Sequence, residues 1–140
     1  MIVKKLLKSG ARTLLGGGIA YLGAQAALNP GQRPEVAKKT LDQIRGVVPL
    51  PFDDETAVRL NGAAQALFGA TLSLGLLPRV SALGLAATLV PTTLAGHSFW
   101  EKDADARPGD IVQFSKNAAI IGGLLFIVAG DKKVVKKVKK

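Results

Sequence analysis

Four stretches of this sequence contain no charged residue, and they constrain the fold more than any other feature. They lie at residues 13–32, 60–78, 80–100 and 117–130. The first three have about the 20 residues that an α-helix needs to cross the hydrocarbon core of a bilayer. A helix at the surface of a soluble protein needs a polar face, which such stretches do not supply. The pattern predicts an all-α fold, a bundle of four transmembrane helices.

The whole chain, residues 1–140, is expected to form one membrane domain. The fourth charge-free stretch is too short alone, and it becomes long enough if the helix starts near Ile111 and Lys116 extends its ammonium to the lipid headgroups. The expected spans are residues 11–28, 57–77, 80–98 and 111–130. The competing fold is a soluble helical domain whose helices are buried on every side.

The segment between the first two spans carries its own helix signal. Residues 34–45 place Val36, Leu41 and Ile44 among charged side chains, as in a short amphipathic helix. Asp53 and Asp54 follow and are suited to cap the second span. We expect this helix on the extracytoplasmic side.

The distribution of charge predicts the orientation, because short cytoplasmic loops collect Lys and Arg. If both termini and the turn near Arg79 share one side, that side holds 11 basic residues and 1 acidic residue, and the other side holds 8 basic and 9 acidic residues. The N- and C-termini are therefore expected in the cytoplasm and the protein in the plasma membrane. The basic tail, residues 131–140, is expected either to bind anionic lipid or to act only as a solvated orientation signal.

The formal net charge of +9 does not by itself indicate nucleic-acid binding. Such binding favours basic side chains clustered on a folded surface together with stacking aromatics, and aromatic residues are scarce here. The first 26 residues also imitate a secretory signal peptide. We interpret them as a retained first span.

Helices in lipid associate through small residues and interhelical hydrogen bonds. Small residues are predicted to form packing faces at Gly16, Gly17, Gly18, Ala20 and Gly23, at Gly62, Ala66, Gly69 and Ala70, and at Gly122 and Gly123. Polar side chains are expected to point into the bundle at Asn61, Gln65, Thr92, Thr93 and Asn117, because an unpaired amide in hydrocarbon is costly.

Few catalytic groups are available. The chain has no cysteine, which excludes thiol chemistry, and a single histidine, which excludes a cluster of histidine metal ligands. We predict no catalytic residue, no metal site and no covalently bound cofactor.

The run from Gly96 to Glu101 combines His97 with Phe99 and Trp100 at the outer end of the third span. These rings suit an aromatic belt at the membrane interface, with His97 hydrogen-bonded inside the bundle. The alternative is a quinone site in which the rings stack on the ligand and His97 binds a carbonyl oxygen. Its predicted members are His97, Phe99, Trp100, Asn61, Gln65 and Lys116.

Several runs resemble the DoxX family as it occurs in actinobacteria. They are residues 58–65, 77–79, 91–101 (PTTLAGHSFWE), 113–117 (QFSKN) and 122–125. The resemblance covers spans two to four and extends more loosely to the first span. It implies a four-span membrane protein related to a subunit of a thiosulfate to quinone oxidoreductase. An actinobacterial relative is linked to an oxidoreductase assembly with superoxide dismutase and a sulfurtransferase.

Two functions follow as expectations. The first is an accessory or scaffold subunit of a membrane redox or respiratory assembly, which docks other membrane subunits through its small-residue groove and the outer loop at residues 34–52. The alternative is a quinone-linked oxidoreductase subunit that binds a quinone near the outer end of span three. Transport ranks below both, because no acidic residue lies within a span.

Overall fold

The computed structural model describes residues 1–130, which form helices joined by turns and loops, without strands. The elements are α1 (Ile2–Leu28), α2 (Arg33–Arg45), α3 (Asp54–Ser73), α4 (Pro78–Gly96), the 3₁₀ helix η1 (Phe99–Glu101) and α5 (Arg107–Ala129). The predicted all-α fold is confirmed. The predicted basic tail, residues 131–140, lies outside the described part of the chain.

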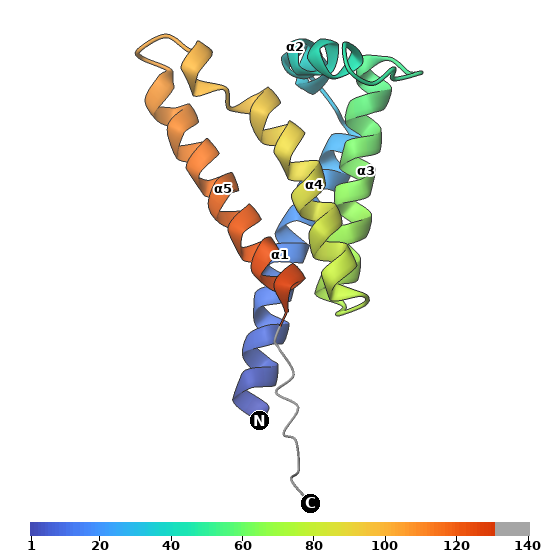
Figure 1. The fold of residues 1–140 in the computed structure, drawn as a ribbon, viewed down its shortest axis with the longest axis vertical. Coiled ribbons are helices and arrows are strands. Elements are labelled where there is room, and N and C mark those ends of the chain that lie inside the picture. The colour runs from blue at the N-terminus through green and yellow to red at the C-terminus, as the bar shows by residue number, and fades with distance from the viewer. Residues whose placement is uncertain (131–140) are drawn as a thin grey trace, which may run out of the picture.

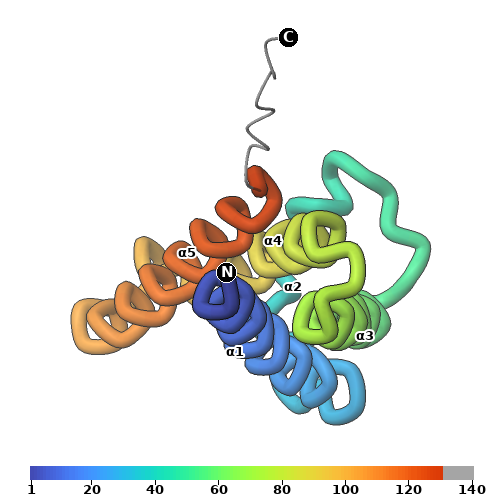
Figure 2. The backbone as a smooth tube through the Cα atoms, turned by 90° about the horizontal axis from the view of Figure 1, so that it is seen from below, coloured from blue at the N-terminus to red at the C-terminus, as the bar shows by residue number. Residues whose placement is uncertain are grey.

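The four long helices run along the length of the molecule, and α2 lies across one end of it (Figure 1). The N-terminus and the turn between α3 and α4 lie toward the opposite end. α1 packs along α3, α4 packs against both α3 and α5, and α2 contacts α3 and α4. Seen from below, α5 and α3 lie on opposite sides of α1 (Figure 2). We call the α2 end the outer end and the other the inner end.

Several helix boundaries differ from those expected. α1 begins at Ile2 instead of residue 11, because Lys and Leu are good helix formers and extend the helix beyond the charge-free stretch. α3 begins at Asp54, since Asp53 caps it by accepting a hydrogen bond from the Thr56 backbone N–H at 2.8 Å. The turn expected at residues 77–79 lies at residues 74–77, and α4 begins at Pro78.

Glycines bring the backbones of α1 and α3 into direct contact. A Cβ atom at Gly16 would lie 2.5 Å from the Gly69 carbonyl oxygen, and one at Gly23 would lie 2.6 Å from that of Gly62. The contacts are reciprocal, which leaves no room for a methyl group on either helix. The predicted small-residue faces of the first two spans are confirmed at these four glycines, which pack against each other. The prediction is wrong for Gly18, where a Cβ atom would meet nothing within 4 Å, and Gly17 is only near the Ser73 side chain, at 3.8 Å.

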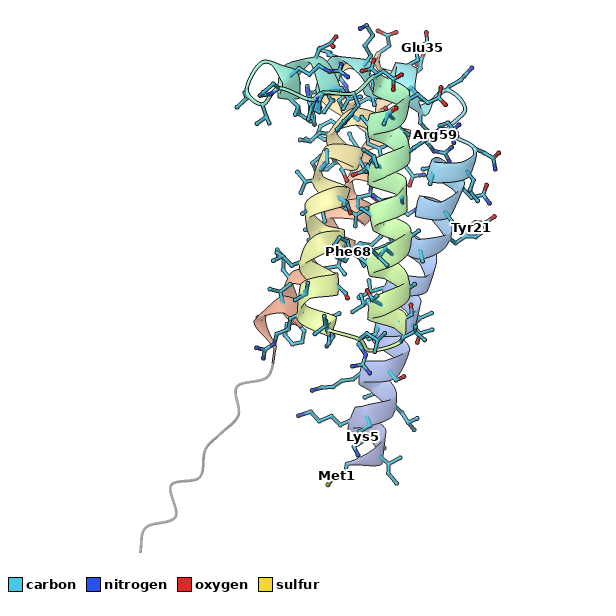
Figure 3. All side chains as sticks on the ribbon, turned by 90° about the vertical axis from the view of Figure 1, so that its right-hand side faces the viewer. Met1, Lys5, Tyr21, Glu35, Arg59 and Phe68 are labelled. Atoms are coloured by element: carbon cyan, nitrogen blue, oxygen red, sulfur yellow. The ribbon has the colours of Figure 1, made fainter. Side chains whose placement is uncertain are left out.

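α3 and α4 join through side chains. The ring of Phe68 lies against Gly84, where a Cβ atom would come within 2.5 Å of it. Figure 3 shows Phe68 between the two helices. The hydroxyl groups of Thr71 and Ser81 are 2.7 Å apart near the inner turn. A small apolar core continues from this interface at Ile19, Leu72, Ala82, Leu85, Ala86, Leu89 and Leu124.

α5 is packed much more loosely, and Leu124 is its one buried residue. The prediction that Gly122 and Gly123 form a close packing face is wrong. A Cβ atom at Gly122 would meet nothing within 4 Å, and one at Gly123 would meet the Leu15 side chain only at 3.7 Å. The sequence pattern shows that these residues are small but not which way they face.

Large apolar side chains cover the outside of the long helices. Leu14 is 81% exposed, Leu67 61% and Phe126 79%, although each lies within a charge-free stretch. Figure 3 shows Tyr21 pointing away from the bundle in the outer half of α1. Within residues 1–130, two helical segments are long and apolar enough to cross a membrane, Pro78–Glu101 and Arg107–Ala129.

Candidate ligand-binding pocket

A cavity of about 950 Å³ lies in the outer half of the molecule. All five α-helices contribute to its wall, from Ile19 and Ile120 to the underside of α2. Its volume falls at the upper end of the range typical of small-molecule sites, and most of its lining is apolar. The cavity forms because α5 meets α1 only toward the inner end and diverges from it toward the outer end (Figure 1).

The roof of the cavity is the apolar face of α2. Val36, Thr40 and Ile44 line the cavity at a spacing of one helical turn. The charged residues Glu35, Lys38, Lys39 and Asp42 surround a separate shallow depression on the other face. The predicted amphipathic helix is therefore confirmed, and it covers the cavity.

An ion pair holds α2 to the loop after α4. Lys39 Nζ lies 2.6 Å from Glu101 Oε1, and this hydrogen bond lowers the pKa of Glu101 below its ordinary value of 4.5. At the other end of the helix, Arg45 Nη2 donates to the Phe52 carbonyl oxygen at 3.1 Å. These contacts fix α2 over the cavity without a large buried interface.

Two amide side chains of α3 line the cavity and meet a threonine of α4. Asn61 Nδ2 donates to Thr92 Oγ1 at 2.9 Å, and Gln65 Nε2 donates to the same oxygen at 3.1 Å. Gln65 is only 5% exposed. Asn61 and Gln65 are one helical turn apart, so both reach Thr92 from one face of α3.

The same arrangement joins α5 to α4. Asn117 Nδ2 donates to Thr93 Oγ1 at 3.1 Å, and Asn117 also lines the cavity. The prediction that Asn61, Gln65, Thr92, Thr93 and Asn117 point into the bundle is confirmed. Gln113, four residues before Asn117, lines the cavity as well and was missed, although its helical spacing from Asn117 was available in the sequence.

His97 lines the cavity at the carboxyl end of α4. Its Nδ1 lies 3.3 Å from Asp110 Oδ1 at the start of α5, and both side chains are partly buried. Lys102 also approaches this carboxylate, with Nζ 3.8 Å from Oδ2. A carboxylate oxygen accepts hydrogen bonds, so Nδ1 of His97 carries a proton in this contact. Asp110 was not predicted as a site residue.

The structure does not bring together all six predicted site residues. Asn61, Gln65 and His97 line the cavity, whereas Phe99, Trp100 and Lys116 do not. Phe99 and Trp100 form an edge-to-face cluster with Phe114, with ring centroids 5.2 to 6.0 Å apart. Lys116 Nζ instead donates to Gln113 Oε1 at 3.0 Å. The aromatic rings thus brace the outer end of α5.

Within residues 1–130, no three or more His, Cys, Asp or Glu side chains gather so that they could hold a metal ion. Comparisons with protein-family models, curated proteins and solved structures give no match to the chain. The resemblance to the DoxX family stays a prediction that rests on the motif residues.

Proposed function

We propose that this protein is a four-span integral membrane protein that binds an amphipathic molecule of the quinone class in the cavity beneath α2. The observation that carries the proposal is the cavity itself. Its apolar walls suit a ring and an isoprenoid chain, and its polar residues gather where three helices meet. Such a combination orients a ligand that is mostly apolar and carries a few polar atoms.

The membrane location is supported by the large apolar side chains on the outside of the long helices, which lipid solvates better than water does. Helices α4 and α5 have the length and composition of spans. We assign α1 and α3 as spans too, because glycine contacts bind them to each other along their length and their outward faces carry exposed leucines.

The charge distribution supports cytoplasmic termini and an extracytoplasmic α2. Every acidic residue of the described chain lies in residues 35–55 or 101–110, at the outer end. Figure 3 shows Lys5 at one end of the molecule and Glu35 at the other. We place the inner end, which within residues 1–130 carries Lys and Arg without acidic residues, on the cytoplasmic side of the plasma membrane. Anionic lipid remains the proposed partner of the basic tail.

We also propose that the protein is an accessory subunit of a membrane redox assembly. The resemblance of its motifs to the DoxX family supports this role. The surface first expected to dock a partner needs correction. The glycine faces of the first two spans are occupied by each other, so the outer loop at residues 34–52 remains as the proposed docking surface.

Binding of decylubiquinone to the protein in lipid nanodiscs tests the proposal. We expect His97→Ala to weaken binding by about tenfold, the loss of one hydrogen bond to a polar group. Trp100→Ala is the matched control, because Trp100 neighbours the site in sequence but does not line the cavity. Saturable binding that is insensitive to His97→Ala, or no binding at all, would contradict the proposal.

A further inference from the structure

Two threonine hydroxyl groups of α4, of which Thr92 lines the cavity, each donate their only hydrogen to a backbone carbonyl oxygen. Thr92 Oγ1 donates to the Thr88 carbonyl oxygen at 2.8 Å, and Thr93 Oγ1 donates to the Leu89 carbonyl oxygen at 2.7 Å. In both cases the acceptor is the carbonyl oxygen four residues earlier in α4, a common partner of a threonine hydroxyl group inside a helix. Toward every other side chain these oxygens act only as acceptors.

The committed hydroxyl groups determine the orientation of three amides. Asn61, Gln65 and Asn117 each meet one of the threonine oxygens, so each must direct its NH₂ group toward it. The reversed amide would place two acceptor oxygens in contact, which is unfavourable. The hydrogen bonds of the two threonines therefore determine which end of each amide is the NH₂ group and which is the carbonyl oxygen.

Each of these amides keeps a carbonyl oxygen that receives no hydrogen bond from residues 1–130. All three residues line the cavity. The polar side of the cavity thus collects three acceptors from two helices, α3 and α5.

A carbonyl head group, which only accepts hydrogen bonds, would leave these acceptors without a donor. A hydroxyl group both donates and accepts, so it satisfies a carbonyl oxygen and also the remaining N–H of the same amide. A site built around such groups discriminates strongly against an analogue that lacks the hydroxyl, because its own polar atoms then stay unpaired.

We infer that the cavity takes the hydroxylated form of an amphipathic ligand in preference to the carbonyl form. For the quinone class this means the quinol, and this version of the inference rests on the proposed function. The same acceptors suit the hydroxyl groups of a glyceride. Hydroxyl recognition is the shared chemistry, and the two sources are separated by experiment.

The test compares four probes under anaerobic conditions with the full chain in nanodiscs. They are decylubiquinol, its dimethyl ether, decylubiquinone and monoolein. We expect the quinol to bind at least about tenfold more tightly than the ether and the quinone. The ether matters most, since it keeps the reduced ring and its oxygen acceptors and replaces the two donor hydrogens by methyl groups.

A threonine series connects this selectivity to the network. Thr92→Val removes the oxygen that orients Asn61 and Gln65, so the ratio of quinol to ether affinity should fall several-fold. Thr92→Ser keeps the hydroxyl and should retain the ratio. Thr88→Val is a matched control one turn away, because the Thr88 hydroxyl bonds the Leu85 carbonyl oxygen and does not line the cavity.

The possible outcomes separate the two claims. If the quinone or the ether binds as tightly as the quinol, the inference is overturned and the proposed function stands. If monoolein binds and no ring compound does, the proposed function is overturned and hydroxyl recognition stands. If none of the four probes binds, both are overturned.

Discussion

The α1–α3 pair and the α4–α5 pair solve the same problem of helix association in different ways. In the first pair, glycines let the backbones touch at Gly16–Gly69 and at Gly23–Gly62. In the second, α5 contributes one buried residue, a hydrogen bond from Asn117 and an aromatic cluster at its outer end. The first pair is in contact along its length, whereas α5 is held mainly by α4 and diverges from α1 toward the outer end, where the cavity lies.

The physical cause of this difference is the position of the small residues. Glycines at a spacing of seven residues on both α1 and α3 form matching flat surfaces, and close backbone approach maximises van der Waals contact. On α5, a Cβ atom at Gly122 would meet nothing within 4 Å and one at Gly123 would meet only the Leu15 side chain, so neither glycine brings two backbones together. α5 therefore depends on polar side chains for its position.

Gly62→Ala should have the largest effect on stability. Its Cβ would lie 2.6 Å from the Gly23 carbonyl oxygen and 2.8 Å from the Ala27 nitrogen, both of them backbone atoms that cannot move independently. We expect a loss of about 1–3 kcal/mol in the free energy of unfolding, as for overpacked cores. Reversible denaturation in mixed micelles measures it.

Gly18→Ala is the matched control on the same helix pair. A Cβ there would meet nothing within 4 Å. It should leave stability unchanged or raise it by up to about 1 kcal/mol through helix propensity. Equal destabilisation by the two substitutions would refute the assigned interface.

Asn117→Ala should have a smaller effect, confined to the second pair. It removes the hydrogen bond to Thr93 Oγ1, and we expect a loss of about 1 kcal/mol, or somewhat less for a bond between helices in lipid. The exposed Ser115 on the same helix offers Ser115→Ala as a control. If the Asn117 variant were as stable as the control, the hydrogen bond would not position α5.

The contact between α2 and the end of α4 should show the smallest effect, and it depends on pH. Lys39 lowers the pKa of Glu101 below 4.5. The ion pair therefore stabilises the position of α2 fully above pH 4.5, and this stabilisation is lost as the pH falls through the lowered pKa. Spin labels at Gln43→Cys and Asp103→Cys should report a broader distance distribution only in that acidic range.

Glu101→Gln should give the broad distribution at every pH, because it removes the charge that pairs with Lys39. Asp42→Asn is the control, since Asp42 pairs with Lys38 within α2. A narrow distribution in the Glu101 variant at neutral pH would show that the ion pair does not hold α2.

Much of the fold was accessible from the sequence, because absence of charge and helical spacing are local signals. They predicted the helices, the amphipathic α2 and the inward direction of Asn61 and Gln65. They did not predict that Gly122 faces open space, since residue size carries no information about which neighbour a helix meets.

The site was predicted only in part for a related reason. His97, Phe99 and Trp100 are adjacent in sequence, but α4 ends at Gly96, and the 3₁₀ helix that follows turns the two rings away from His97 toward Phe114. Asp110 reaches His97, and Gln113 reaches the cavity, because α5 returns antiparallel to α4. That pairing depends on tertiary packing, which no local pattern encodes.

The central claim is that the long helices cross a membrane with α2 on the outer side and the α3–α4 turn inside. The chain has no cysteine, so single cysteines can be introduced without background. A membrane-impermeant maleimide should label Ala104→Cys in intact cells, label Leu76→Cys only after lysis, and leave Leu67→Cys unlabelled in the membrane. Labelling of both Ala104→Cys and Leu76→Cys in intact cells, or of Leu67→Cys in membranes, would contradict the account.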